Sequence, residues 1–179
     1  MAVNQFNLPE HRRAERKLLI TVAEWKEPTG TTGTATTTVR EILGRRTEDS
    51  SIEYNPDVAT STDILGINYT DVNKTQPSQT FDPYLVLGGS KLGAKLNDIR
   101  RRNAISELDQ FDMYIITAYV GSEGLYEAEK HEGCTIQYTS LGGDSNVNMP
   151  ITVNFSNKIT NGTVDKLTDD FTFTPDVNV

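Results

Sequence analysis

The sequence predicts a mainly β fold: a β-sandwich or barrel flanked by one α-helix, with an extended N-terminal arm and one long loop. Three observations lead to this prediction. Several short segments alternate between apolar and polar residues, glycine-containing turn signals separate them, and one segment has helical periodicity. The 179 residues suffice for one domain with a core. We expect an arm over residues 1–16 and a single β domain over residues 17–179.

The first predicted strand is KLLITVAEW, residues 17–25. Apolar side chains occupy both of its alternating sets of positions, which is typical of a strand buried on both faces. A threonine-rich stretch follows, in which seven of the ten residues from Thr29 to Thr38 are threonine. We interpret residues 27–41 as either a flexible loop or the tip of a long polar hairpin.

Further alternating segments predict strands along the rest of the chain. Residues 50–55 (SSIEYN) put Ile52 and Tyr54 on one face, which we expect in the core because burying a large apolar side chain stabilises a fold by roughly 1.5–3 kcal/mol. Residues 111–120 (FDMYIITAYV) form the most apolar run, which predicts a central strand. The other predicted strands are 62–70, 134–139, 149–157 and 169–175.

One segment, residues 90–103, predicts an amphipathic helix. It follows a Gly-Gly pair, Ser90 is a suitable N-cap, and Leu92, Leu96 and Ile99 lie on one stripe at helical spacing. The basic residues lie mainly on the outer side. This is the helix that flanks the predicted β fold.

The segment before the helix, NKTQPSQTFDPY at residues 73–84, contains two prolines and no His or Cys. Proline fixes the backbone angle φ and removes a hydrogen-bond donor, so the segment is stiff. Phe81 and Tyr84 are predicted to anchor it. Its role is either to present a reproducible contact to a neighbouring subunit or to serve as a rigid internal loop.

Composition argues against several functions. The net charge of −8 and the pI of about 4.8 make a wrapped nucleic acid or an anionic membrane an unfavourable partner. The lone cysteine, Cys134, excludes an intrachain disulfide and a Cys-based metal cluster. Because it alternates with Ile136 and Tyr138, we expect a buried, inert thiol. The N-terminal segment has no apolar core of signal-peptide length, and no run of 18 apolar residues predicts a membrane anchor.

No arrangement of residues predicts an active site. His11 lies in the polar arm beside two arginines, and His131 has carboxylates and Cys134 nearby from one stretch only. A structural or surface role for His131 is therefore expected, with catalysis and metal binding as the alternatives. Glycoside hydrolysis would need two opposed carboxylates in a cleft rich in aromatic residues, and the sequence has too few aromatic residues to predict such a cleft. The glycine-rich stretches lack the spacing of a phosphate-binding loop. We expect a protein that is not an enzyme, with no cofactor and no metal.

Charge is segregated along the chain. Residues 48–82 carry seven acids and one lysine, a net charge of −6, whereas residues 83–102 carry five bases and one acid, a net charge of +4. Such polarity favours self-assembly, in which the basic element of one copy meets the acidic surface of another; the alternative is an ordinary solvated surface. The basic residues are Lys91, Lys95, Arg100, Arg101 and Arg102.

Two long stretches, STDILGINYTDVNKTQPSQTFDPYLVLGGSKLGAKLNDI (61–99) and HEGCTIQYTSLGGDSNVNMPITVNFSNKITNGTVDKL (131–167), resemble the major tail tube proteins of tailed bacteriophages. The similarity is to the branch found in phages and prophages of Gram-positive, gut-dwelling bacteria, and it spans residues from about 50 to 175. It implies a β-sandwich or barrel with one helix that builds hexameric rings, stacked into a hollow virion tail tube through which DNA passes without sequence-specific binding.

The resemblance also implies partners and surfaces. The partners are further copies of the chain, a tape-measure protein, tail-terminator or baseplate proteins and, in contractile tails, a sheath; the protein is made in the host cytoplasm. We expect Glu48, Glu53 and Asp57 to line the lumen, where acids repel the phosphates of DNA. The basic helix residues, Phe81 and Tyr84 are expected at contacts between subunits. Alternatives are the inner tube of a phage-like injection system, secretion system or bacteriocin, and a monomeric β-sandwich binding module.

Overall fold

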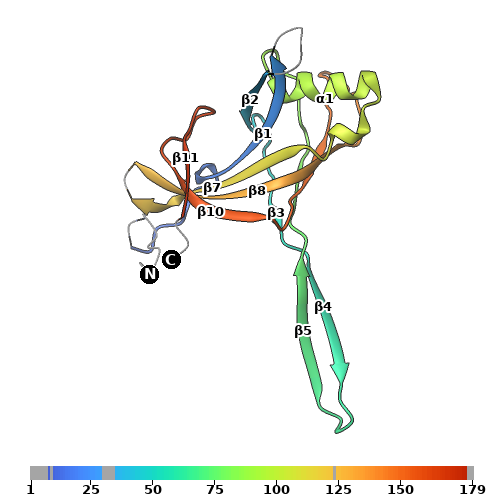
Figure 1. Ribbon diagram of the computed structural model, residues 1–179, viewed down its shortest axis with the longest axis vertical. Helices are drawn as coiled ribbons and strands as arrows, with labels where there is room; N and C mark the ends of the chain where they lie inside the picture. Colours follow the sequence, from blue (N-terminus) through green and yellow to red (C-terminus); the bar gives the residue numbers. More distant parts are fainter. Residues whose placement is uncertain (1–7, 9, 30–34, 123, 177–179) are drawn as a thin grey trace.

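The computed structural model describes residues 8, 10–29, 35–122 and 124–176. Within them the fold is mainly β, sandwich-like and antiparallel, with one α-helix, which confirms the predicted fold class. One β-hairpin projects far from this body (Figure 1).

Nine of the strands in the described residues form one sheet with the order β2-β1-β7-β8-β9-β6-β3, and β8 also pairs with β10, which pairs with β11. Their bounds are β1 (Leu19–Thr29), β2 (Ala35–Ile42), β3 (Ile52–Glu53), β6 (Ser78–Phe81), β7 (Phe111–Ser122), β8 (Leu125–Tyr138), β9 (Ile151–Asn154), β10 (Ile159–Val164) and β11 (Phe173–Pro175). Short 3-10 helices cover Arg16–Leu18 (η1) and Ile105–Glu107 (η2).

Strand β8 joins the two halves of the sheet. Its first half pairs with β7 and β10, and its last four residues pair with β9. Between these halves Gly133 has a φ of +71°, and the β7–β8 register shifts between Phe111 and Met113. Such irregularities bend a strand, so the sheet folds over a core instead of remaining flat.

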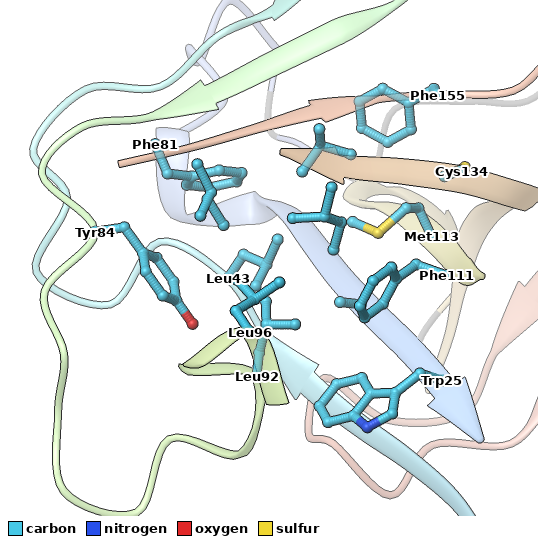
Figure 2. Close-up of a cluster of buried hydrophobic side chains, with 14 of the residues drawn as sticks. Trp25, Leu43, Phe81, Tyr84, Leu92, Leu96, Phe111, Met113, Cys134 and Phe155 are labelled. Carbon is cyan, nitrogen blue, oxygen red and sulfur yellow. The ribbon is translucent and has the colours of Figure 1, made fainter. Parts of the chain in front are cut away.

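The main core lies between the folded sheet and the helix α1 (Lys91–Arg102). Figure 2 shows Leu92 and Leu96 of α1 close to Trp25 and Phe111, and the rings of Trp25 and Phe111 meet edge to face with centroids 6.1 Å apart. Leu92, Leu96 and Ile99 are fully buried, as the helical stripe predicted.

A second core cluster covers the opposite face of the same sheet, beneath the segment that leads into β11. Val22 of β1 and Tyr114 of β7 belong to this cluster, whereas their chain neighbours Ala23 and Met113 belong to the main core. Successive strand residues point to opposite faces. Strands β1 and β7 are therefore buried on both faces, as predicted for residues 17–25 and 111–120.

Helix α1 begins with two acceptors at its N-terminus. Ser90 Oγ accepts a hydrogen bond from the Gly93 amide at 3.0 Å, which confirms the predicted N-cap. The Glu41 carboxylate, from β2, accepts from Ser90 Oγ at 2.8 Å and from the amides of Lys91 and Leu92. The helix ends at Arg102, and its C-cap Asn103 is in the left-handed conformation with a φ of +55°, where its amide donates to the carbonyls of Ile99 and Arg100. The first three amides of the helix are thus satisfied by side-chain acceptors.

The projecting hairpin consists of β4 (Pro56–Thr62) and β5 (Asn68–Thr75), which pair only with each other among the described strands. Figure 1 shows it extending away from the body as a two-stranded ribbon. All seven residues of β4 are exposed. An isolated two-stranded hairpin is at best marginally stable in water, so this element has an unusual amount of unsupported surface.

The hairpin overturns two predicted strands. The predicted strand 62–70 is instead the hairpin turn with the start of β5, and Ile64 and Leu65 are 102% and 77% exposed. The predicted strand 50–55 shrinks to β3, and Tyr54 is 54% exposed instead of buried. The physical reason is that β4 and β5 leave the body here, so alternating apolar residues have no core to enter.

The stiff segment before the helix also differs from its predicted role. Phe81 and Tyr84 are 1% and 6% exposed and belong to the main core (Figure 2). They anchor the segment, as predicted, but they offer no surface to a neighbouring subunit. The prediction that these two side chains lie at a subunit contact is therefore wrong, because the chain's own core already surrounds both rings.

The threonine-rich stretch is a hairpin instead of a flexible loop in its described part. Residues 27–29 continue β1, and residues 35–41 belong to β2, with Trp25 opposite Val39 and Pro28 opposite Thr36. This confirms the hairpin alternative for the described part of the stretch. Residues 30–34 of the stretch, and 1–7 and 9 of the predicted N-terminal arm, lie outside the described residues.

Cys134 lies in the main core with 1% exposure. The Ser156 amide donates to its Sγ at 3.4 Å, and burial raises the pKa of the thiol. Since the thiolate is the reactive form, we expect a thiol reagent to label Cys134 at least 100-fold more slowly in native protein than in urea-unfolded protein. Mass spectrometry of timed samples measures both rates. Labelling at similar rates in the two states would contradict a buried thiol.

Candidate assembly surface

The hairpin presents the largest group of exposed apolar side chains in one element. Their exposures range from 49% for Tyr69 to 102% for Ile64. Exposed apolar patches rimmed by polar residues mark interaction sites, whereas single exposed apolar residues are normal. The six exposed side chains are Val58, Ile64, Leu65, Ile67, Tyr69 and Val72.

The tip of the hairpin is held in one conformation by Asp63. Its Oδ1 accepts hydrogen bonds from the amides of Leu65 at 2.8 Å and Ile67 at 2.9 Å, and its Oδ2 accepts from the Tyr69 hydroxyl at 3.1 Å. The amide of Ile67 is the main reason why the pKa of this carboxyl lies below its ordinary value. Gly66 supplies the positive φ that the turn requires. Ile64 and Leu65 are thus presented on an ordered turn.

The root of the hairpin is fixed to the body. Asn55 Nδ2 donates to the carbonyl of Gln76 at 3.3 Å and to Ser78 Oγ at 3.1 Å. These bonds connect the segment before β4 to the segment after β5. The Gln76 amide donates to the Tyr54 carbonyl at 3.1 Å, and the Phe155 amide donates to the Pro77 carbonyl at 2.9 Å. The hairpin is therefore held in place at its base.

A groove of about 440 Å³ lies between the start of β1 and the segment after β2. Leu19, Ile20 and Ile42 are half-buried in it. Three bases and one acid line it, and they are Arg16, Lys17, Arg45 and Glu48. The Arg16 guanidinium donates to the Ser50 carbonyl at 2.6 Å, and Lys17 also contacts Glu15. The groove combines apolar surface with a positive rim.

The three acids predicted to line a lumen are all exposed. Glu48 lies in the loop after β2, Glu53 lies on β3, and Asp57 lies on β4 at the root of the hairpin. Their exposure leaves them accessible to solvent or to a channel. The lumen position of these residues stays a prediction.

The basic helix is partly neutralised by acids of the same chain. Lys95 Nζ lies 2.7 Å from Glu107 Oε2, and Arg102 lies 2.7 Å from Asp98 and 2.8 Å from Glu107. Lys91, Arg100 and Arg101 have no ion pair among the described residues. A contact between these three bases and another subunit remains a prediction, and variants of Lys91 and Arg101 test it without disturbing the intrachain pairs.

The ion pairs of Glu107 give a testable pH dependence. Hydrogen bonds from Arg102 and Lys95 lower the pKa of Glu107 from 4.5 to about 2. A depressed folded-state pKa contributes stability that is present above the unfolded pKa and is lost as the pH falls toward the folded value. We expect Glu107→Gln to cost about 1 kcal/mol at pH 7, and this difference to shrink between pH 4.5 and pH 2.

Urea unfolding at pH 7, 4 and 2.5 measures the difference. Asp109→Asn is the matched control, because Asp109 forms no ion pair among the described residues. A difference between wild type and Glu107→Gln that stays constant down to pH 2.5 would show that the pairs add no stability.

His131 is buried and held by packing. Its Nδ1 lies 2.8 Å from the Ser156 carbonyl, its ring meets Phe155 edge to face, and its Nε2 lies 3.6 Å from Glu129. Cys134 Sγ donates to the backbone carbonyl of His131 and not to its ring. These contacts support the predicted structural role. Within the described residues, no three His, Cys, Asp or Glu side chains gather as a metal site requires.

Sequence reasoning missed the hairpin. A signal was present: residues 56–62 and 68–75 contain four threonines, two valines and a tyrosine and flank a short turn that contains Asp63 and Gly66, which is a hairpin pattern. The apolar residues of the turn obscured it, because they extend the alternation of β5.

No helix in the described part of the chain is both long and apolar enough to cross a bilayer.

A scan against protein-family models found no match for this sequence. A search of curated proteins also found no match.

Proposed function

We propose that the protein is a structural subunit that assembles into stacked hexameric rings, which form the hollow tail tube of a phage virion. The observation that carries the proposal is the hairpin of residues 56–75, an ordered, unsupported ribbon with six exposed apolar side chains. Such an exposed apolar surface is rare on a monomer, whereas a repeating assembly requires one surface that meets a different surface on the next copy. The groove beside β1 supplies such a second surface.

Other features support the same role. The net charge of −8 suits a channel that DNA must cross without sticking, because phosphates bind proteins through Lys and Arg. Glu48, Glu53 and Asp57 are the residues we place toward this channel. Trp25, which a carbohydrate-binding platform would need on its surface, is 3% exposed. The inner tube of an injection particle needs the same geometry; neighbouring tape-measure and capsid genes distinguish a phage.

Negative-stain microscopy and sedimentation velocity over a range of concentrations test the proposal. We expect rings or tubes from wild-type protein. A shortened variant, in which a two-residue turn replaces residues 57–74 and joins Pro56 to its partner Thr75, should remain a folded monomer. Matching near-UV circular dichroism of the two proteins shows that the body is intact. Wild-type protein that stays monomeric at every concentration would overturn the proposal.

A further inference from the structure

One buried side-chain atom in the described part of the chain has no hydrogen-bond partner, and it is Nε2 of His131. The residue lies on β8 and is 2% exposed. Its Nδ1 lies 2.8 Å from the Ser156 carbonyl oxygen, which can only accept, so Nδ1 carries a hydrogen and donates. In a neutral ring this leaves Nε2 as a bare acceptor. A buried acceptor without a donor costs free energy, so its position requires an explanation.

The imidazole of His131 is held in its orientation from two sides. Its ring meets Phe155 edge to face, with ring centroids 5.1 Å apart. Ser156, which accepts from Nδ1, is itself fixed, because its amide donates to Cys134 Sγ at 3.4 Å. Nε2 therefore keeps one direction, toward the Glu129 carboxylate, whose Oε2 is 3.6 Å away. Two acceptors face each other there as long as the ring is neutral.

Glu129 forms the one ion-pair contact of His131 in the part of the chain that the structure describes. On the flanking strands, the residues opposite His131 are Met113 of β7 and Ile159 of β10, and neither titrates. The other titratable side chains nearby have partners of their own, which are Asp112 for Lys130, Lys158 for Glu132 and the backbone carbonyl of His131 for Cys134. The charge of Glu129 is therefore the one that Nε2 meets.

Glu129 also lines a hollow of about 280 Å³ in which negative charge is crowded. Glu127 and Asp176 line the same hollow, and no Lys or Arg does so among the described residues. Burial, followed by the charges of Asp176 and Glu129, raises the pKa of Glu127. Burial, followed by the charges of Glu129 and Tyr119, raises the pKa of Tyr54. A positive charge on the buried side of Glu129 would offset this repulsion.

We propose that His131 and Glu129 form a proton-dependent ion pair. A proton taken from solvent adds a hydrogen at Nε2, which donates to the Glu129 carboxylate, so that two facing acceptors become donor and acceptor. Loss of the proton to solvent restores the two acceptors and frees the carboxylate. Histidine changes its charge near neutral pH, so the pair forms in mildly acidic solution and separates in alkaline solution. Both groups belong to one chain, so this inference does not depend on the proposed self-assembly.

Thermal unfolding at two pH values tests the ion pair. Glu129→Gln removes a carboxylate whose side chain is 48% exposed, so the variant should fold. The contribution of Glu129 to stability is present below the pH at which histidine titrates and is lost above it. We expect Glu129→Gln to lower the midpoint of unfolding by about 3 °C at pH 5.5 and not to lower it at pH 8, where one crowded carboxylate is merely removed.

Glu127→Gln is the matched control, because it makes the same change on the same face of β8 without a contact to His131. It should lower the midpoint at neither pH. An equal loss for Glu129→Gln at both pH values, or no loss at pH 5.5, would overturn the ion pair. A difference at pH 5.5 that disappears on addition of EDTA would assign the space to a metal ion and would also overturn it.

A second variant and a direct measurement complete the test. His131→Asn retains a donor for the Ser156 carbonyl but has no second nitrogen in the ring position, so Glu129→Gln should have no pH-dependent effect in this background. Nitrogen-15 NMR of the wild-type ring needs no variant, and the exposed His11 is its internal reference. We expect hydrogens on both ring nitrogens of His131 at pH 5.5 and on Nδ1 alone at pH 8. An Nε2 without hydrogen at pH 5.5 would overturn the proposal.

Discussion

Replacing Glu41 with alanine should lower the free energy of unfolding by about 2–3 kcal/mol. The Glu41 carboxylate is 9% exposed and accepts hydrogen bonds from Ser90 Oγ and from the first amides of α1, Lys91 and Leu92. Removal leaves buried N–H groups unpaired, at about 1–3 kcal/mol, and removes a negative charge from the positive end of the helix dipole, at roughly 0.3–1 kcal/mol. Urea unfolding followed by circular dichroism measures the change.

Glu41→Gln is the control for this prediction. The glutamine keeps an acceptor oxygen of similar reach but has no charge, so it should cost roughly half as much as alanine. If alanine costs less than about 0.5 kcal/mol, water satisfies the helix N-terminus and the carboxylate has no capping role.

Replacing Glu24 with methionine should destabilise the fold by about 3–5 kcal/mol, because it leaves the largely buried Arg40 without its partner. Arg40 Nε lies 2.5 Å from Glu24 Oε2, and its guanidinium carbon lies 4.3 Å from the centre of the Phe171 ring. The Tyr114 hydroxyl donates to the same carboxylate, and burial, followed by the charge of Glu24, raises the pKa of Tyr114 to about 12. The Arg40 guanidinium, which also donates to the Phe171 carbonyl at 2.6 Å, thus connects the sheet to the segment that covers the second core cluster.

The double variant Glu24→Met/Arg40→Met separates the ion pair from simple packing. Removing both charges abolishes the unpaired buried cation, so the double variant should be more stable than Glu24→Met alone. Thermal and urea unfolding of the four proteins complete the cycle. Additive losses in the double variant would show that the two residues are not energetically coupled.

The sequence predicted well those features that depend only on residues within one segment of the chain. The helical stripe of α1, its Ser90 cap and the double-sided burial of β1 and β7 all follow from spacing within one segment. The capping role of Glu41 does not, because the residue lies about 50 positions before the amides that it binds. A contact of that kind depends on how the elements pack.

The hairpin of β4 and β5 also could not be predicted, because its position depends on how distant parts of the chain pack. Alternation in residues 62–70 indicates extended backbone, but it carries no information on whether another strand or core lies beside that backbone. Asn161-Gly162 is a comparable case, since this turn-like pair lies inside β10. There Gly162 allows close approach of β11, because a Cβ at this position would lie 2.3 Å from the Thr174 carbonyl oxygen.

The fixed root of the hairpin determines how the molecule bears mechanical load. The strands on either side of the root, β3 and β6, pair with each other, and β6 pairs with β9 over four residues. Antiparallel hydrogen bonds run perpendicular to their strands. Tension along the hairpin therefore loads all the β6–β9 bonds together in shear, whereas a sideways pull would peel them one at a time. The root of the hairpin therefore resists tension along the strands better than a sideways pull.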